Sequence, residues 1–222
     1  MTSEGTVKCI ALKMNIGNAN NIIKDLMKSD YRYSASDKLF FTSDTHFYHT
    51  KIIEFANRPF SSVEEMNETL IRNWNETVPE DGIVFHLGDF CFGTAQQWLQ
   101  ILSGLNGKIH LVMGNHDMRN AGEDFMKTFA SVSQQRTIIV DGQSIILNHN
   151  PFLCFGGAYR GVWQLFGHVH SGPRSLGNGK DDARLVHLFP TQYDVGVDNN
   201  EYRPVSYCQL KEIMLNKKLY GN

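Results

Sequence analysis

Short apolar runs alternate with segments of helical spacing between residue 38 and about residue 130. The apolar runs are rich in β-branched and aromatic residues, which is typical of buried strands. The segments between them repeat apolar side chains every three or four residues, which predicts amphipathic helices. The expected strands are Leu39–Thr42, Ile83–Leu87 and Ile109–Met113, and the expected helices are Thr50–Ala56, Val63–Val78, Thr94–Leu102 and Gly122–Phe129. This alternation indicates a parallel or mixed sheet that is covered on both faces.

The pattern changes after Ala130, where strands are expected to follow one another. Asp141-Gly142 separates two apolar segments, and this dipeptide is a strong hairpin signal. Ser171–Ala183 contains three glycines and a proline, which predicts a mobile loop. The expected strands are Thr137–Val140, Ser144–Leu147, Gly161–Phe166, Arg184–Phe189, Asp194–Val197 and Arg203–Tyr207, the last three antiparallel, and the closing helix is Tyr207–Lys217.

Residues 1–37 are interpreted as an extension in front of the main body. Val7–Leu12 fits a short strand, and Asn20–Tyr31 carries an apolar stripe that predicts a helix. We expect this strand and helix to pack on the core, with a dimer contact as the alternative. Residues 38–222 are expected to form the main body of a single compact domain with two half-sheets.

Composition and charge narrow the functional class. A formal net charge of −2 gives no basic footprint for a polyanion, so duplex nucleic acid is not an expected partner. No stretch approaches the ~20 apolar residues of a membrane span, so no membrane partner is expected either. The four scattered cysteines form no C-x-x-C pair, which suits a reducing compartment. We therefore expect a cytoplasmic protein that is a monomer or a homodimer.

Side chains that can bind metal ions directly follow five of the expected strands. Because ligands bind at the carboxyl ends of strands in open α/β sheets, we expect these side chains to meet at one edge. In two places the donors are two residues apart, and side chains at positions i and i+2 of an extended chain point the same way. The donors are Asp44, His46, Asp89, Asn115, His149, His168 and His170.

The number and chemistry of these seven donors indicate which metals they suit. Seven donors exceed the four of a closed structural zinc site, and they fit two cations that share a bridging carboxylate. A single structural metal ion is the less favoured alternative. A set of imidazole, carboxylate and amide groups without thiolate is suited to transition-metal ions, with Mn²⁺ favoured and Fe, Zn, Ni or Co as alternatives.

Five short motifs stand in the order that is typical of calcineurin-like metallophosphoesterases. They are Asp44-Thr45-His46, Gly88-Asp89, Gly114-Asn115-His116-Asp117, His149 and Gly167-His168-Val169-His170. The chain resembles this family over about residues 38–207, and within it the small bacterial or phage type of phosphoesterase. The resemblance implies an α/β fold in four layers, with a two-sheet mixed β-sandwich flanked by helices.

The resemblance also implies a role for each of these residues. The implied ligands are Asp44, His46 and His170 for the first ion and Asn115, His149 and His168 for the second ion, with Asp89 as the bridge. His116 would be a catalytic residue that assists the leaving group, and Asp117 would orient its ring. The implied reaction is hydrolysis of a phosphodiester or phosphomonoester by a metal-bridged hydroxide.

Three further residues are candidate substrate contacts. His49 lies three residues after His46, Arg119 follows the catalytic turn, and Arg160 precedes the strand that leads to His168. An arginine can bind phosphate oxygens, but each of the three residues also fits an ordinary solvated loop position.

The expected substrate is a small phosphate ester, with a nucleotide-like compound favoured. The second motif continues as Phe90-Cys91-Phe92-Gly93 and lacks the Arg-Gly ending of serine/threonine protein phosphatases, so that class is disfavoured. A nuclease is an alternative, although it would normally bring a capping domain and a basic groove. The alternative from another class is a non-catalytic metal-binding scaffold for protein–protein interaction, which the complete donor set does not favour.

Overall fold

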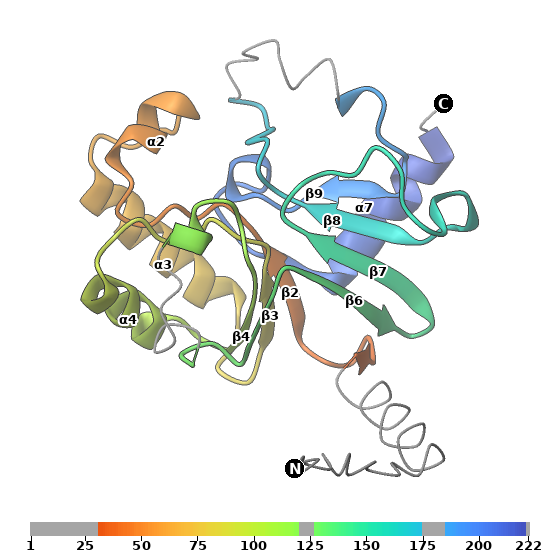
Figure 1. Cartoon of the computed structure of the whole chain (residues 1–222), viewed down its shortest axis with the longest axis horizontal. Helices are drawn as coiled ribbons and strands as arrows, with labels where there is room; N and C mark the ends of the chain where they lie inside the picture. Colours follow the sequence, from red (N-terminus) through yellow and green to blue (C-terminus); the bar gives the residue numbers. More distant parts are fainter. Residues whose placement is uncertain (1–30, 120–126, 175–184, 221–222) are drawn as a thin grey trace, which may run out of the picture. The chain divides into compact units, whose positions relative to one another are not determined.

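The computed structural model describes residues 31–119, 127–174 and 185–220, and two five-stranded sheets form its centre (Figure 1). In the first sheet, four neighbouring strands are parallel and one edge strand is antiparallel to them. The order of this sheet is β10 (Val205–Ser206), β2 (Leu39–Thr42), β3 (Ile83–His86), β4 (Lys108–Val112) and β5 (Ser131–Ser133). The carboxyl ends of β2, β3 and β4 therefore lie at the same edge.

The second sheet combines the predicted hairpin with two parallel strands. Its order is β1 (Arg32–Tyr33), β6 (Gln135–Val140), β7 (Gln143–Asn148), β8 (Trp163–Phe166) and β9 (Gln192–Asp194). Strands β6 and β7 are antiparallel around the Asp141-Gly142 turn, whereas β7, β8 and β9 run parallel to one another. The carboxyl ends of β7 and β8 are thus also neighbours.

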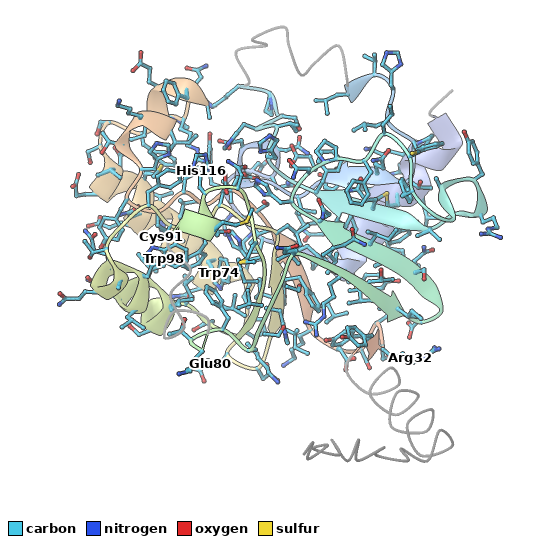
Figure 2. All side chains as sticks on the ribbon, in the orientation of Figure 1. Arg32, Trp74, Glu80, Cys91, Trp98 and His116 are labelled. Atoms are coloured by element: carbon cyan, nitrogen blue, oxygen red, sulfur yellow. The ribbon has the colours of Figure 1, made fainter. Side chains whose placement is uncertain are left out.

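Three helices cover one face of the first sheet: α2 (Thr50–Phe55), α3 (Val63–Thr77) and α4 (Ala95–Gly104) (Figure 1). The Ser62 side chain accepts a hydrogen bond from the Glu65 N–H at the start of α3, and Thr94 forms a capping box with Gln97 at the start of α4. These caps satisfy backbone donors that the first turn leaves unpaired. The buried Trp74 and Trp98 lie on the side of these helices (Figure 2).

The other face of the first sheet packs against the second sheet. Phe41 and Phe85 are fully buried there with their rings stacked at 5.8 Å, and Ile145 and Leu165 come from the second sheet. Helix α7 (Tyr207–Tyr220) adds Leu210 to the same cluster. Two mixed sheets flanked by helices are the fold that the sequence predicts, and this prediction is confirmed.

Some expected strands are wrong or displaced in the second half of the chain. The described part of Arg184–Phe189 forms turns, because the Leu188 N–H bonds locally to the Leu185 carbonyl at 3.2 Å instead of to a strand. The strand expected at Asp194–Val197 ends at Asp194, and it is parallel to its neighbour rather than antiparallel. The antiparallel pairing of β10 is as expected. Strands β1 and β5 have only two and three residues, and neither is predicted.

Several expectations fall outside the described residues. These are the strand Val7–Leu12, the helix Asn20–Tyr31 apart from its last residue, and the helix Gly122–Phe129 apart from its last three residues. The loop Ser171–Ala183 is described only in its first four residues. The packing of residues 1–37 therefore stays a prediction. Among the described helices, none is long and apolar enough to cross a membrane.

Candidate metal centre

All seven predicted donors lie together at the carboxyl ends of five strands. The first sheet contributes donors after β2, β3 and β4, and the second sheet contributes donors after β7 and β8. His116 lies at the same place, directly before the short helix η1 (Asp117–Arg119) (Figure 2). The close contacts described next link all seven side chains into one cluster.

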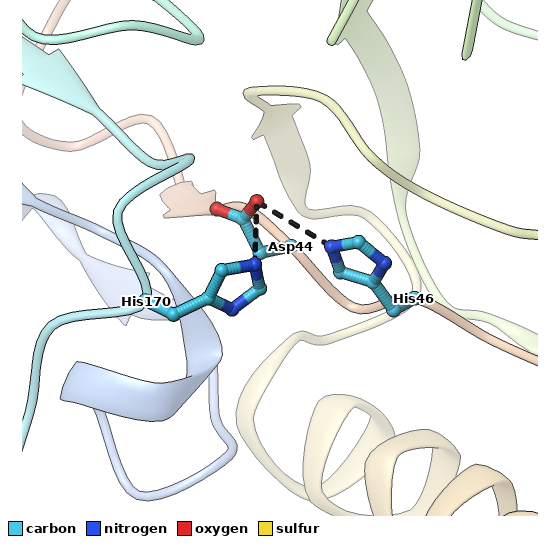
Figure 3. A group of neighbouring side chains, drawn as sticks. All are labelled: Asp44, His46 and His170. Carbon is cyan, nitrogen blue, oxygen red and sulfur yellow. Dashed lines mark ion pairs between the residues drawn. The ribbon is translucent and has the colours of Figure 1, made fainter. Parts of the chain in front are cut away.

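Asp44, His46 and His170 form the first donor group (Figure 3). Asp44 Oδ1 lies 3.7 Å from His46 Nε2 and 3.9 Å from His170 Nε2. Both Asp44 Oδ1 and His46 Nε2 are buried and have no hydrogen-bond partner. Buried polar atoms without a partner are costly, and a cation bound between them would satisfy both.

Asn115, His149 and His168 lie together as a second donor group, and His149 also forms a candidate metal-binding group with Asp44 and Asp89. Asn115 Oδ1 lies 3.0 Å from His149 Nε2, and His168 Nδ1 lies 3.2 Å from the same nitrogen. His149 Nδ1 is 2.7 Å from the Leu87 carbonyl oxygen. Because a carbonyl can only accept, Nδ1 carries the hydrogen and donates it, which leaves the lone pair of Nε2 facing Asn115 and His168.

Asp89 lies between the two groups. Its Oδ2 is 3.6 Å from His46 Nε2 and 3.6 Å from His149 Nε2. Its Oδ1 accepts a hydrogen bond of 3.0 Å from the His116 backbone N–H. Burial raises the pKa of the Asp89 carboxyl, and the nearby Asp44 charge acts in the same direction, while His149 acts against both. A carboxylate that faces both groups in this way is suited to bridge two cations.

The separations between the donor atoms fit coordination of metal ions. Ligand atoms that share one ion at about 2.1 Å lie roughly 3.0–3.4 Å apart. The separations in the second group, 3.0 and 3.2 Å, match this spacing, whereas those in the first group, 3.7 and 3.9 Å, would shorten by about half an ångström or less when an ion binds. Together with the two unpartnered buried atoms, these separations show that the residues present fit the implied metal ions.

The donors project from a backbone of unusual conformation. Five of them have positive φ angles: Asp44 (57°), His46 (50°), Asp89 (54°), His168 (71°) and His170 (47°). Such angles are uncommon outside glycine and cost free energy, and they cluster at functional sites. The expectation that each i, i+2 pair faces one centre from extended chain is therefore wrong: the backbone at these residues is left-handed, and His168 and His170 belong to different donor groups. Left-handed turns, not extended strands, aim these side chains.

At two motif positions only glycine fits, because the backbone there lies directly against a donor carboxylate. A Cβ on Gly114 would lie 2.2 Å from Asp89 Oδ1, and a Cβ on Gly167 would lie 2.1 Å from Asp44 Oδ2. Any larger residue would displace the carboxylate that it touches. The glycines in these motifs thus let the turns pass directly against the buried carboxylates.

A buried ion pair that the sequence did not reveal supports the first donor group. His170 Nδ1 lies 2.7 Å from Asp198 Oδ2, so the ring donates to this carboxylate and presents Nε2 to Asp44. Arg58 binds both Asp198 oxygens, at 2.8 and 2.9 Å, and donates to the backbone carbonyls of Asp44 and Thr45 at 2.7 and 3.0 Å. Burial acts to raise the pKa of Asp198, but the charges and hydrogen bonds of Arg58 and His170 together outweigh it, and the pKa is lowered.

We expect the Asp198→Asn variant to bind the first metal ion about 10- to 100-fold more weakly, because carboxylates that orient ligating histidines contribute to affinity by about this factor. Isothermal titration of metal into the metal-free protein measures this change. The exposed Asp81, which pairs with Lys38 at 2.7 Å, provides the control Asp81→Asn. Unchanged metal affinity in folded Asp198→Asn protein, with thermal unfolding as the check on folding, would contradict the orienting role.

The expected role of Asp117 needs correction. Its carboxylate accepts hydrogen bonds from the backbone N–H groups of Gly114 and Asp89 at 2.8 Å and of Phe90 at 3.0 Å. These bonds join the two turns that carry Asp89 and Asn115. Both carboxylate oxygens are thus directed to backbone donors and not to the His116 ring, since Asp117 lies at the start of η1 and is buried beneath the turn.

The three candidate substrate contacts have different surroundings. His49 Nδ1 lies 3.1 Å from His46 Nδ1, and the His49 ring stacks on Phe92 with centroids 3.9 Å apart. The His49 ring therefore contacts one donor, His46, and the neighbouring Phe92. Arg160 is exposed at the end of the short helix η2 (Ala158–Arg160), and Arg119 is the last residue of η1. The contact of all three with substrate stays a prediction.

Comparison with known proteins agrees with this fold and site. The Calcineurin-like phosphoesterase family matches residues 38–176, a range that contains the whole donor cluster. The chain belongs to this family of metallophosphoesterases, and the resemblance inferred from its motifs is confirmed. The family acts on phosphoesters and typically binds divalent metal ions, for which this chain has candidate ligands.

Three similar proteins have names that state no activity. An uncharacterized protein of Methanocaldococcus jannaschii is 37% identical over 171 residues, which cover 76% of this chain and 86% of that protein. The Gene 66 protein of Mycobacterium phage D29 is 27% identical over 68% of this chain and 86% of its own length. A solved structure of a protein of unknown function from Aquifex aeolicus covers 80% of this chain and all of its own, with a TM-score of 0.62 and 23% identity. This last likeness concerns the fold alone.

Proposed function

We propose that the chain is a phosphoester hydrolase that uses two transition-metal ions. The observation that carries this proposal is the position of Asp89, whose Oδ2 lies 3.6 Å from a ring nitrogen of each donor group. One carboxylate between two sets of nitrogen and oxygen donors matches the arrangement of binuclear sites. Asp44, His46 and His170 would hold one ion, Asn115, His149 and His168 the other, and Asp89 both.

The chemistry of the site divides between the ions and the protein. When bound, two such ions lower the pKa of water and stabilise the charge of a phosphoryl group. The protein holds the ligands in place from two sheets, so that little reorganisation is needed when charge develops. Mn²⁺ is the ion that we favour, with Fe, Zn, Ni and Co as alternatives, because the donor set contains no thiolate.

His116 is the residue that we assign to proton transfer. Its Nε2 lies 3.8 Å from Asp89 Oδ2, and its side chain is 35% exposed, so the ring is next to the donor cluster and still accessible to a substrate. The Phe92 ring packs against it with centroids 4.7 Å apart. From this position the protonated ring can donate its hydrogen to the leaving oxygen of an ester.

A small phosphate ester is the substrate class that we propose, with phosphodiesters and nucleotide-like compounds favoured. The net charge of −2 provides no general attraction for a polyanion such as duplex nucleic acid. A phosphate held by bound cations needs no such basic surface, since the cations offset its charge directly.

Metal removal followed by metal return tests this proposal. We expect chelated protein to be inactive toward bis-p-nitrophenyl phosphate, and activity to return when Mn²⁺ or another of the proposed ions is added. The same assay extends to phosphomonoesters, cyclic nucleotides and pyrophosphate to define the substrate. Full activity after exhaustive chelation would contradict the proposal. Two bound ions without hydrolysis of any of these esters would favour the metal-binding scaffold instead.

A further inference from the structure

A cavity of about 480 Å³ opens beside His168, which also belongs to the second donor group. Two segments form most of it: the loop after β7 and the turns that precede β9. Its described lining residues are Asn150, Pro151, Leu153, His168, Val169, Leu185, His187 and Leu188. This volume lies within the range of pockets that bind organic ligands, about 300–1,000 Å³.

The chemistry of this cavity differs from that of the metal centre. None of its described lining residues is Asp, Glu, Lys or Arg, and its apolar side chains include three leucines. Leu153 is 76% exposed, although it lies on the wall of a concave site. A cavity with apolar walls and only a few polar groups, here Asn150 and His187, suits an uncharged organic group rather than a second phosphate.

The cavity shares one lining residue, His168, with the metal centre. The His168 backbone N–H donates to Asp44 Oδ2 at 2.8 Å, and its ring nitrogen Nδ1 lies 3.2 Å from His149 Nε2. A phosphate held by the donor groups would therefore be one side chain away from the cavity.

We propose that this cavity binds an uncharged aromatic ring on the substituent that stays attached to phosphorus, such as a phenyl group or a nucleobase carried on its sugar. This inference rests on the proposed function, because it places the phosphate at the metal centre. It adds that the specificity of the enzyme comes from Leu153, Leu185 and Leu188, and that methyl or other small alkyl esters are poor ligands.

A pair of phosphonates that cannot be hydrolysed tests the cavity by binding alone. Phenylphosphonate and methylphosphonate carry the same phosphoryl group, and only the first carries a ring. We expect Mn²⁺-loaded wild-type protein to bind phenylphosphonate about tenfold more tightly in isothermal titration, because the ring loses apolar contact with water. The Leu153→Ser variant and the double variant Leu153→Ser, Leu188→Ser should lose most of this preference and bind methylphosphonate as before.

The exposed Leu99 of α4, which is 53% exposed and does not line the cavity, provides the matched control Leu99→Ser. This variant should keep the preference for phenylphosphonate. Because Leu153 is itself largely exposed, its replacement should leave folding intact even if the double variant does not fold. Equal affinity of wild-type protein for the two phosphonates, or an unchanged preference in Leu153→Ser and the double variant, would overturn the inference.

Hydrolysis of two p-nitrophenyl diesters separates this inference from the proposed function. The leaving group is the same in methyl p-nitrophenyl phosphate and thymidine 5′-p-nitrophenyl phosphate, and only the retained group differs. We expect a higher kcat/KM for the thymidine ester. Equal hydrolysis of both would refute the cavity assignment and leave the phosphoesterase intact. Binding of neither phosphonate and hydrolysis of neither diester would refute both.

Discussion

The Asp89→Asn variant should lose roughly a thousandfold in kcat/KM toward bis-p-nitrophenyl phosphate. The substitution keeps the size of the side chain and removes the negative charge that faces His46 and His149 at 3.6 Å. If Asp89 bridges two cations, that charge helps to hold both, and several kcal/mol of stabilisation are lost with it. Each 1.4 kcal/mol corresponds to about a tenfold change in rate. Steady-state kinetics with the metal at saturation measures the loss.

Measuring the metal content of the variant shows whether the activity is lost because metal ions are lost. We expect Asp89→Asn to retain fewer than two ions per chain after dialysis, whereas the surface variant Asp81→Asn should retain the wild-type number. The amide oxygen of the substituted side chain can still accept the His116 backbone hydrogen bond that Asp89 Oδ1 accepts at 3.0 Å, so the turn should persist. Two tightly bound ions and near wild-type activity in Asp89→Asn would show that Asp89 is not the bridge.

The His116→Ala variant should lower kcat toward phenyl or alkyl phosphate esters by a factor of about 10²–10⁴, which is the usual contribution of a general acid, and should leave metal binding unchanged. His116 belongs to neither donor group, and its ring lies partly exposed beside them. Metal content and kcat measured on the same preparation test both halves of this prediction. Loss of one ion in His116→Ala would show that the residue is a ligand.

The leaving group offers a sharper test of the same role. A general acid matters most when the leaving oxygen is a poor leaving group, because a good one departs without a proton. The loss in His116→Ala should therefore be small for p-nitrophenyl esters and large for phenyl or alkyl esters. An equal loss for all leaving groups would contradict proton donation and would favour a role in binding the phosphate.

The donor cluster was predictable because its members follow apolar runs directly. Asp44, Asp89 and Asn115 each come within three residues of the end of a strand, and strand ends of one parallel sheet must share an edge. The sequence could therefore place these side chains together without showing any distance. The conformation of the turns was not predictable, because positive φ angles at aspartate and histidine leave no pattern in the sequence comparable to that of glycine.

Residues that support the donors were missed for a different reason. Arg58 and Asp198 are 140 residues apart in the chain, and neither directly follows a strand. Only the tertiary fold reveals their pairing. Asp198 had one weak signal, since it comes shortly after the end of β9, whose last residue is Asp194, in the run Asp194-Val195-Gly196-Val197-Asp198. A search for acidic residues near strand ends, rather than directly at them, could have found it.

Anomalous diffraction from crystals of the Mn²⁺-loaded protein tests the binuclear centre most directly. We predict two peaks about 3.5–4 Å apart at the carboxyl ends of β2, β3, β4, β7 and β8. One peak should contact His46 and His170, the other His149 and His168, and Asp89 should contact both. A single peak, or two peaks that do not share Asp89, would contradict the proposed centre.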